Sequence, residues 1–295
     1  TGQDSWKAEI TDMAGKGIMA WEWKGASPDI RWNGTDSAGN QVADGNYRIT
    51  ISSTDEAGNR TVKTLEPITV DARTPRAFFT ASALGLSPNG DGKFDTTTFS
   101  IVLNPKDGIE SWKLEILGPA GSVYRTLGSG KTTPPETVLW DGKNDGGQII
   151  EGSYTARLQV LYTKGDVIEQ AITAMLVDIS GPKISFSTSP QYFSPDNDGV
   201  DDELTMRINV QDASPIATWN LEIREPEGPR QLFYRIEGKG TPSAQYTWDG
   251  RSNKGELVQA ATDYPVQVQA VDTLGNTSSI TGIIGVDVLV IREGD

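Results

Sequence analysis

One block of sequence occurs three times, and this repetition constrains the fold more than any other feature. The copies span residues 32–47, 140–154 and 248–264, and each begins with a tryptophan and ends with a tyrosine. Glycine follows each tryptophan two and seven positions later, within a cluster rich in Asn and Asp. Such a cluster predicts a turn with positive φ, which glycine adopts without steric cost. We therefore expect the tryptophan to be the last inward residue of a strand and the tyrosine to anchor the returning strand.

The repeat extends beyond this block on both sides. Upstream, residues 6–10, 112–116 and 219–223 each start with tryptophan and alternate apolar with polar residues, the period of a half-buried strand. These tryptophans are 112−6=106 and 219−112=107 residues apart, a spacing typical of domains and too long for a solenoid unit. Downstream, each copy closes on a Val-Asp pair, at residues 70–71, 177–178 and 286–287.

The distribution of these elements predicts an all-β fold. Many short strands separated by Gly-rich turns, with no helix longer than a turn, favour three tandem β-sandwiches in an extended array. Short Pro-containing junctions at 71–75 and 178–182 place the domains at 1–74, 75–181 and 182–295, and such brief linkers limit bending.

The first domain is expected to be incomplete at its N-terminus. Only five residues precede Trp6, whereas residues 76–109 and 183–216 stand before the same strand in the other copies. This opening also predicts that the chain is a mature or excised piece of a larger protein. A sandwich without its first strands would leave an exposed sheet edge.

Composition excludes several classes of protein. The net charge of −14, with 40 acidic and 26 basic residues, provides no basic face for nucleic acid. The chain has no Cys and no His, which rules out thiol nucleophiles, Ser-His-Asp triads and ordinary zinc sites. No apolar run of bilayer-spanning length is present, so no membrane-spanning segment is expected in this sequence.

The three Trp–Tyr blocks resemble the FlgD-type Ig-like domain, first described in the flagellar hook-capping protein. The resemblance covers nearly the whole chain, and it departs from the pattern in the third copy, where Thr262 replaces the glycine two before the tyrosine. It implies that the three sandwiches are small Ig-like or fibronectin-III-like domains, of the kind found in tandem in exported and cell-envelope proteins of bacteria. Hook capping itself is not implied. The openings of the second and third copies, residues 86–95 and 193–202, also resemble those of secreted bacterial Ig-like modules.

These two openings are the best candidates for a metal site. Side-chain oxygens at alternate positions before a glycine can wrap a hard cation such as calcium. The candidate ligands are the oxygens of Asn89, Asp91 and Asp95 in the second copy and of Asp196, Asp198 and Asp202 in the third, with Asp201 in reserve. No Glu closes the loop as in an EF-hand, so an Asx-rich turn without metal is the alternative. The oxygen-rich turns 36–40 and 141–145 are explained by backbone geometry.

Two further residue sets were weighed as functional sites. Trp21 and Trp23 share one face of a predicted strand, and Phe78 and Phe79 lie by a junction; either set is a candidate binding surface or ordinary packing. A glutamate recurs at one strand position, and repetition favours an outward-facing scaffold residue over an acid or base. These residues are Glu9, Glu115 and Glu222.

The sequence therefore predicts a non-catalytic spacer or assembly module of an exported bacterial protein, in the periplasm, at the outer membrane or on the cell surface. Its partners would be proteins or cell-envelope components, and calcium would be its one cofactor. The alternative is an adhesin-like or carbohydrate-binding module that uses loops or Trp21 and Trp23. A third class, a carboxylate-only hydrolase, would need two close carboxylates in a cleft.

Overall fold

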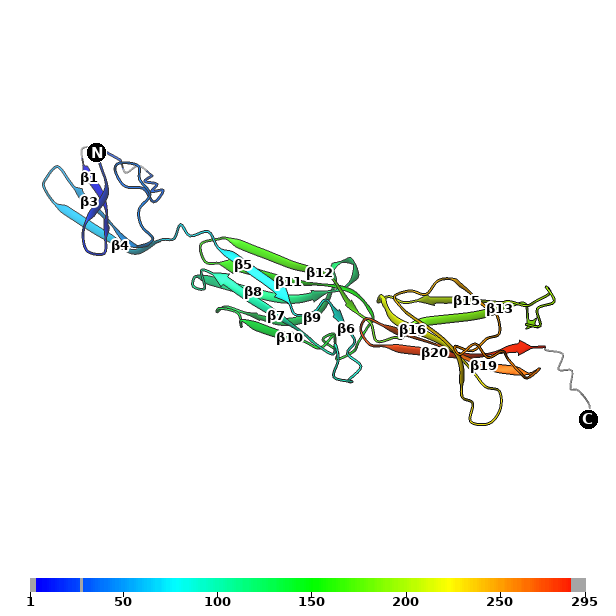
Figure 1. The fold of residues 1–295 in the computed structure, drawn as a ribbon. Coiled ribbons are helices and arrows are strands. Elements are labelled where there is room, and N and C mark those ends of the chain that lie inside the picture. Colours follow the sequence, from blue (N-terminus) through cyan, green and yellow to red (C-terminus); the bar gives the residue numbers. More distant parts are fainter. Residues whose placement is uncertain (1–3, 27–28, 288–295) are drawn as a thin grey trace, which may run out of the picture. The chain divides into compact units, whose positions relative to one another are not determined.

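The computed structural model describes residues 4–26 and 29–287, and these are almost entirely β-structure (Figure 1). The all-β prediction is confirmed; the one helix among the described residues is the three-residue 3-10 turn η1 (Pro119–Gly121). The chain divides into two compact units. Unit 1 comprises Thr1–Arg76, Asn104–Gly108 and Thr163–Asp166, and unit 2 comprises Ala77–Leu103, Ile109–Tyr162 and Val167–Asp295. The predicted domain boundaries stay predictions, and their outer limits, residues 1 and 295, lie outside the described residues.

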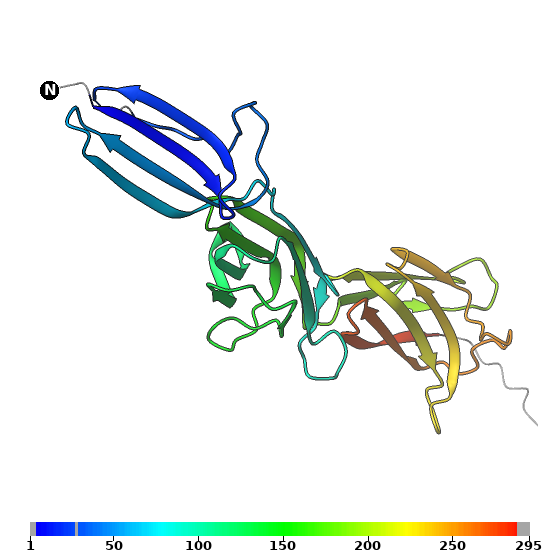
Figure 2. The ribbon, with the colours of Figure 1, turned by 90° about the vertical axis from the view of Figure 1, so that its left-hand side faces the viewer.

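Unit 1 contains one antiparallel sheet, in the order β2-β1-β3-β4 (Figure 2). Its apolar face is only partly buried: Ala8 and Ile10 are inaccessible to solvent, whereas Trp6, Trp21 and Trp23 are half-buried. No second sheet faces it among the described residues of this unit, which explains the incomplete burial. The strands are β1 (Ser5–Asp12), β2 (Gly17–Lys24), β3 (Gly45–Thr54) and β4 (Arg60–Val70).

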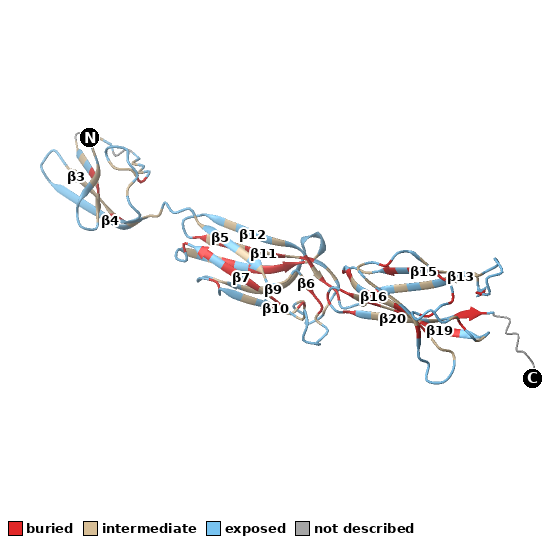
Figure 3. Ribbon diagram, in the orientation of Figure 1, coloured by how far each residue is buried: buried red, intermediate tan, exposed pale blue. Residues whose placement is uncertain are grey.

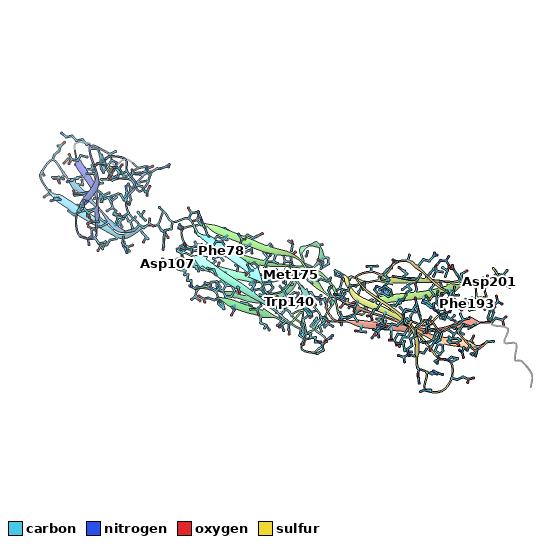
Figure 4. The ribbon with its side chains drawn as sticks, in the orientation of Figure 1. Phe78, Asp107, Trp140, Met175, Phe193 and Asp201 are labelled. Carbon is cyan, nitrogen blue, oxygen red and sulfur yellow. The ribbon has the colours of Figure 1, made fainter. Side chains whose placement is uncertain are left out.

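Unit 2 contains two pairs of sheets, and each pair encloses its own core. In the first pair, a three-stranded sheet β10-β7-β5 faces a five-stranded sheet β6-β12-β11-β8-β9. The strands are β5 (Arg76–Ala81), β6 (Gly85–Leu86), β7 (Thr97–Asn104), β8 (Ile109–Leu117), β9 (Val123–Gly130), β10 (Thr137–Trp140), β11 (Gly152–Tyr162) and β12 (Val167–Val177). Phe99, Trp140 and Met175 are fully buried between the sheets, and buried positions concentrate in this unit (Figures 3 and 4).

The second pair repeats this topology strand for strand. The sheet β13-β15-β18 faces the sheet β14-β20-β19-β16-β17, with Phe193, Trp248 and Tyr264 in the core between them. The strands are β13 (Lys183–Ser189), β14 (Tyr192–Phe193), β15 (Leu204–Gln211), β16 (Ile216–Arg224), β17 (Leu232–Lys239), β18 (Gln245–Trp248), β19 (Asp263–Asp272) and β20 (Thr277–Val286). Alternation of buried and exposed residues along β15 and β19 is the period-2 pattern of strands that face one core.

The Trp–Tyr block is explained by packing and hydrogen bonding. The indole Nε1 of Trp140 donates to the carbonyl of Lys143 at 3.1 Å, and the same bond occurs in the other copies. Gly142 has φ 73°, and a Cβ there would lie 2.7 Å from Pro88 Cγ, so only glycine fits. The Tyr154 hydroxyl donates to the carbonyl of Ile150 at 2.6 Å. The first copy differs from the expectation in one respect: Trp32 lies outside any strand and is half-buried.

The upstream tryptophans show how the first copy departs from the others. Trp112 lies opposite Gly130 and Trp219 lies opposite Gly238, and a Cβ on either glycine would come within 3.0 Å of the indole. The glycines thus let each indole lie across the neighbouring strand. In unit 1 the opposite residue of Trp6 is Trp23, and the two rings instead stack with centroids 6.1 Å apart.

Candidate cation and ligand sites

The opening loop of the second copy is an Asx-rich turn whose side-chain oxygens hold its own backbone. Asp95 accepts hydrogen bonds from the amides of Gly90 and Gly92, both at 2.8 Å. Asn89 Oδ1 accepts from the amide of Asp91 at 2.9 Å, and Asp91 Oδ1 accepts from the next amide but one at 2.7 Å. The predicted ligands therefore lie together, and these hydrogen bonds account for their identity without a metal.

The third copy builds its opening loop in the same way. Asp202 accepts from the amides of Asn197 and Gly199, and Asp196 and Asp198 each accept from an amide two residues on. The carboxylates of Asp196, Asp198 and Asp202 lie within 4.8 Å of one another. Asp201 has positive φ and lies with Phe193 at the same end of its sheets (Figure 4). Calcium binding by either loop stays a prediction.

The turn at residues 36–40, which the sequence explains by backbone geometry, is held by hydrogen bonds from its own amides to a side chain. Asp36 Oδ1 accepts from the amides of Asn40 and Ala38 at 2.9 and 3.0 Å. These hydrogen bonds, first that from the Asn40 amide, favour the charged form and lower the pKa of the Asp36 carboxyl.

Trp21 and Trp23 are neither fully buried nor fully exposed. They lie on the same face of β2, alternating with exposed residues, and both are half-buried. Trp23 also lines a groove of about 430 Å³ with Trp6, Lys7 and Glu22. Near the junction, Phe78 is 68% exposed, whereas Phe79 packs against Phe99 in the core. A stacked indole pair, Trp6 and Trp23, thus lines an open groove in unit 1.

The recurring glutamates take part in ion pairs between or along strands. Glu9 contacts Lys7, and Glu222 contacts Arg224 and Arg235 at 2.5 and 3.1 Å. Glu115 differs from the other two glutamates in exposure, since its side chain is only 2% exposed. It does face away from the core, but Arg157 and Lys113 cover its carboxylate at 2.8 and 2.5 Å. Hydrogen bonds from these two cations lower its pKa against the opposing effect of burial.

The structure also assembles a carboxylate cluster that sequence analysis did not find. Asp178, Asp212 and Asp272 have oxygens within 4.8 Å of one another in unit 2. Of these, Asp178 belongs to a repeated feature of the sequence, the closing Val-Asp pair. The three are far apart in the chain, and no spacing rule connects them, so only the fold brings them together.

Comparison with known proteins supports the family resemblance for the first part of the chain. Residues 2–57 match the FlgD Ig-like domain, the family that the Trp–Tyr blocks resemble. A search of curated proteins gave no match. Within residues 4–26 and 29–287, no helix is both long enough and apolar enough to cross a membrane.

Several solved structures are similar over most of this chain at low identity. A tetra-tandem repeat in the extending region of a large adhesion protein is 13% identical, over 97% of this chain and 68% of that one, with a TM-score of 0.36. A Ca²⁺-stabilized adhesin with which an Antarctic bacterium binds ice is 17% identical over 98% and 66%, with a TM-score of 0.30. A 1.5-MDa bacterial ice-binding adhesin is 15% identical over 97% and 87%, with a TM-score of 0.34.

Proposed function

We propose that this chain is a non-catalytic structural module, a spacer or assembly segment, of an exported bacterial cell-envelope protein. The observation that carries the proposal is that the repeated residues have packing roles. The tryptophan and tyrosine of the second and third blocks lie in a core, and both tryptophans and Tyr154 donate hydrogen bonds to turn carbonyls. The glycine two residues after each of these tryptophans leaves room for a proline. The repeated glutamates are held in ion pairs. What recurs is therefore the means of building a sandwich.

The mechanism of such a module is mechanical. Three sandwiches, bounded at 74/75 and 181/182, would follow one another in an extended array, and short Pro-containing junctions would limit bending between them. The partners would be proteins or cell-envelope components at its ends. Nucleic acid is disfavoured by the charge of −14. Calcium in the opening loops, held by Asp91 and Asp198 among others, would stiffen the turns that lead into the strands.

Small-angle X-ray scattering of the whole chain tests this proposal. A compact globule of 295 residues would have a radius of gyration of about 19 Å. The proposal predicts a value well above this and a scattering profile of an elongated particle. A radius near that of the globule would contradict it.

A second candidate function, ligand binding by unit 1, is favoured by the Trp6–Trp23 pair. Two stacked indoles in an open groove provide a surface on which a sugar ring can stack. Tryptophan fluorescence during titration with cell-wall oligosaccharides tests it. Saturable quenching that the Trp23→Gly variant loses, while Trp219→Phe keeps it, would support binding; no change with any oligosaccharide would remove this function.

A further inference from the structure

We propose that Asp178, Asp212 and Asp272 bind one divalent cation, Ca²⁺, at a site distinct from the two opening loops. Asp178 follows β12, Asp212 follows β15, and Asp272 is the last residue of β19. Each contributes one carboxylate oxygen to a cluster whose members lie within 4.8 Å of one another. Calcium takes oxygen ligands at about 2.3–2.6 Å, so ligands on opposite sides of the ion are about 5 Å apart. The span of the cluster fits one such ion.

Burial makes this cluster different from an exposed acidic patch. The residues Asp178 and Asp272 are 2% and 1% exposed. The donors to their carboxylates are neutral: Ser214 and the Ser180 amide for Asp178, and the Leu274 and Asn276 groups for Asp272. The ion pairs found in the described part of the chain involve other carboxylates. Like charges as close and as buried as those of Asp178 and Asp272 are costly without a cation, and the third carboxylate, Asp212, is partly exposed.

One atom of the cluster points independently to a missing partner. The Oδ2 oxygen of Asp212 is buried and accepts no hydrogen bond from any described residue, although its other oxygen accepts from the Ala213 amide at 2.7 Å. A buried acceptor without a donor is rare in folded proteins, because its desolvation is not compensated. A bound cation would satisfy this oxygen and offset the charge of all three carboxylates together.

In unit 1 the carboxylate that corresponds to Asp178 is paired with an arginine. Asp71 precedes Asp178 by 178−71=107 residues, the repeat length, and is likewise the residue after a closing strand. Its carboxylate is paired with Arg73 Nε at 2.9 Å and lies 3.6 Å from Lys164 Nζ. Arg73 also binds Asp107 at 2.8 Å and lies 3.9 Å from Asp44. Arg73, together with Lys164 beside Asp71, thus supplies positive charge to three carboxylates that converge on the guanidinium.

In unit 2 the arginine is gone and one of the three acids is replaced, because Ser214 stands one repeat length after Asp107. One repeat length after Asp44 and Arg73 stand Glu151 and Ser180. Glu151 keeps a place beside the cluster, since it accepts a hydrogen bond from the amide of Ile179 at 2.9 Å. Asp212 replaces a proline at the matching position, 105, which adds a further acid. A cation in this cluster would take the place that Arg73 holds in unit 1.

The carboxylate cluster can be reached from solvent, and it lies between the two sheet pairs of unit 2. A groove of about 390 Å³ leads to Asp178 and Asp212, with Glu151, Ser180 and Lys183 also along its walls. The ion would join Asp178, which follows β12, to Asp212 after β15 and Asp272 at the end of β19, and these two strands belong to the other pair of sheets. Asn276 already connects these parts, because it donates to the Asp178 carbonyl and accepts from Ser87 Oγ. Binding would therefore fasten one sheet pair of unit 2 to the next.

Isothermal titration with CaCl₂ tests the site, in a full-length chain carrying Asp91→Asn and Asp198→Asn so that the opening loops do not contribute. This background is expected to bind one Ca²⁺ per chain and to melt at a higher temperature in calcium than in EDTA. Adding Asp212→Asn is expected to weaken binding at least tenfold. Adding Ser180→Arg, which restores the arginine of unit 1 at an exposed position, is expected to abolish binding and to raise the melting temperature in EDTA.

Each result decides the question. The proposal is overturned by a background chain with neither heat nor a shift in melting temperature, or by full affinity in Ser180→Arg. It is also overturned if Asp212→Asn folds, as judged by circular dichroism, and binds as tightly as the background. If Asp212→Asn fails to fold, the Ser180→Arg variant decides the question, because Ser180 is exposed and its replacement should leave the fold intact. A negative result would leave the proposed spacer function untouched, since scattering measures that function without calcium.

Discussion

Replacing Gly181 by alanine should loosen the connection between the two sheet pairs of unit 2. A Cβ on Gly181 would lie 2.4 Å from Ser278 Oγ and 2.6 Å from the backbone carbonyl oxygen of Thr277. Non-bonded carbon atoms pack best at about 3.5–4.0 Å, so the two backbone segments have to separate by roughly 1 Å. Overpacking of this kind costs about 1–3 kcal/mol. The φ of Gly181 lies outside the left-handed region, so the expected loss comes from the clash alone.

Hydrogen exchange followed by mass spectrometry measures this effect locally. Peptides covering 178–182 and 272–279 should exchange about 5- to 160-fold faster in Gly181→Ala, the equivalent of that free energy. Gly17→Ala is the matched control, because it also avoids positive φ and its Cβ would lie 3.6 Å from the nearest atom. Unchanged exchange in both peptides would refute the view that close backbone contact holds this junction.

Three further substitutions test the packing account. Tyr154→Phe leaves the Ile150 carbonyl without its 2.6 Å donor and should cost about 1–2 kcal/mol in urea unfolding, whereas Tyr192→Phe, at an exposed ring, should cost nothing measurable. Arg157→Met leaves the buried carboxylate of Glu115 with one cation and should lower the free energy of unfolding by about 3 kcal/mol. The control Arg235→Met, beside the better-solvated Glu222, should lower it by less than about 1 kcal/mol. Equal losses of stability in the two variants would contradict this reasoning. Hydrogen bonds from Arg73 lower the pKa of Asp71 from its ordinary 3.8 to about 2. Because the pKa of Asp71 is lower in the folded state, the stability that Asp71 contributes is present above pH 3.8 and is lost as the pH falls through about 2. NMR titration should follow this carboxyl in the native chain, and the Asp71→Asn variant should show no such loss.

The regular features of the fold were predictable because they follow from local rules. Alternating residues gave the strands, and the glycines at fixed distances from tryptophan gave the turns, as at Gly142 with φ 73°. The prediction for Trp32 was wrong, since that residue lies outside any strand. Unit 1 has no facing sheet among its described residues, so the sequence repeat alone does not ensure the same packing around this tryptophan.

The candidate sites were less predictable because they depend on long-range contacts. The opening loops were found because Asn89 and Asp91 are close in sequence, and the hydrogen bonds of the Asx-rich turn, the alternative to a metal site, are present. Burial of Glu115 depends on a cross-strand arginine 42 positions away. The cluster of Asp178 and Asp272 depends on two turns from different sheet pairs meeting, which no local pattern encodes.

The central claim is that short junctions and close contacts hold neighbouring sandwiches in a fixed arrangement. The chain has no native Cys, so two can be introduced and spin-labelled cleanly. Val102→Cys on β7 and Ile283→Cys on β20 are both exposed positions, 53% and 64%, on the two sheet pairs of unit 2. Double electron–electron resonance between these labels should give one narrow distance distribution. A broad distribution, as expected of domains on a loose tether, would contradict the account.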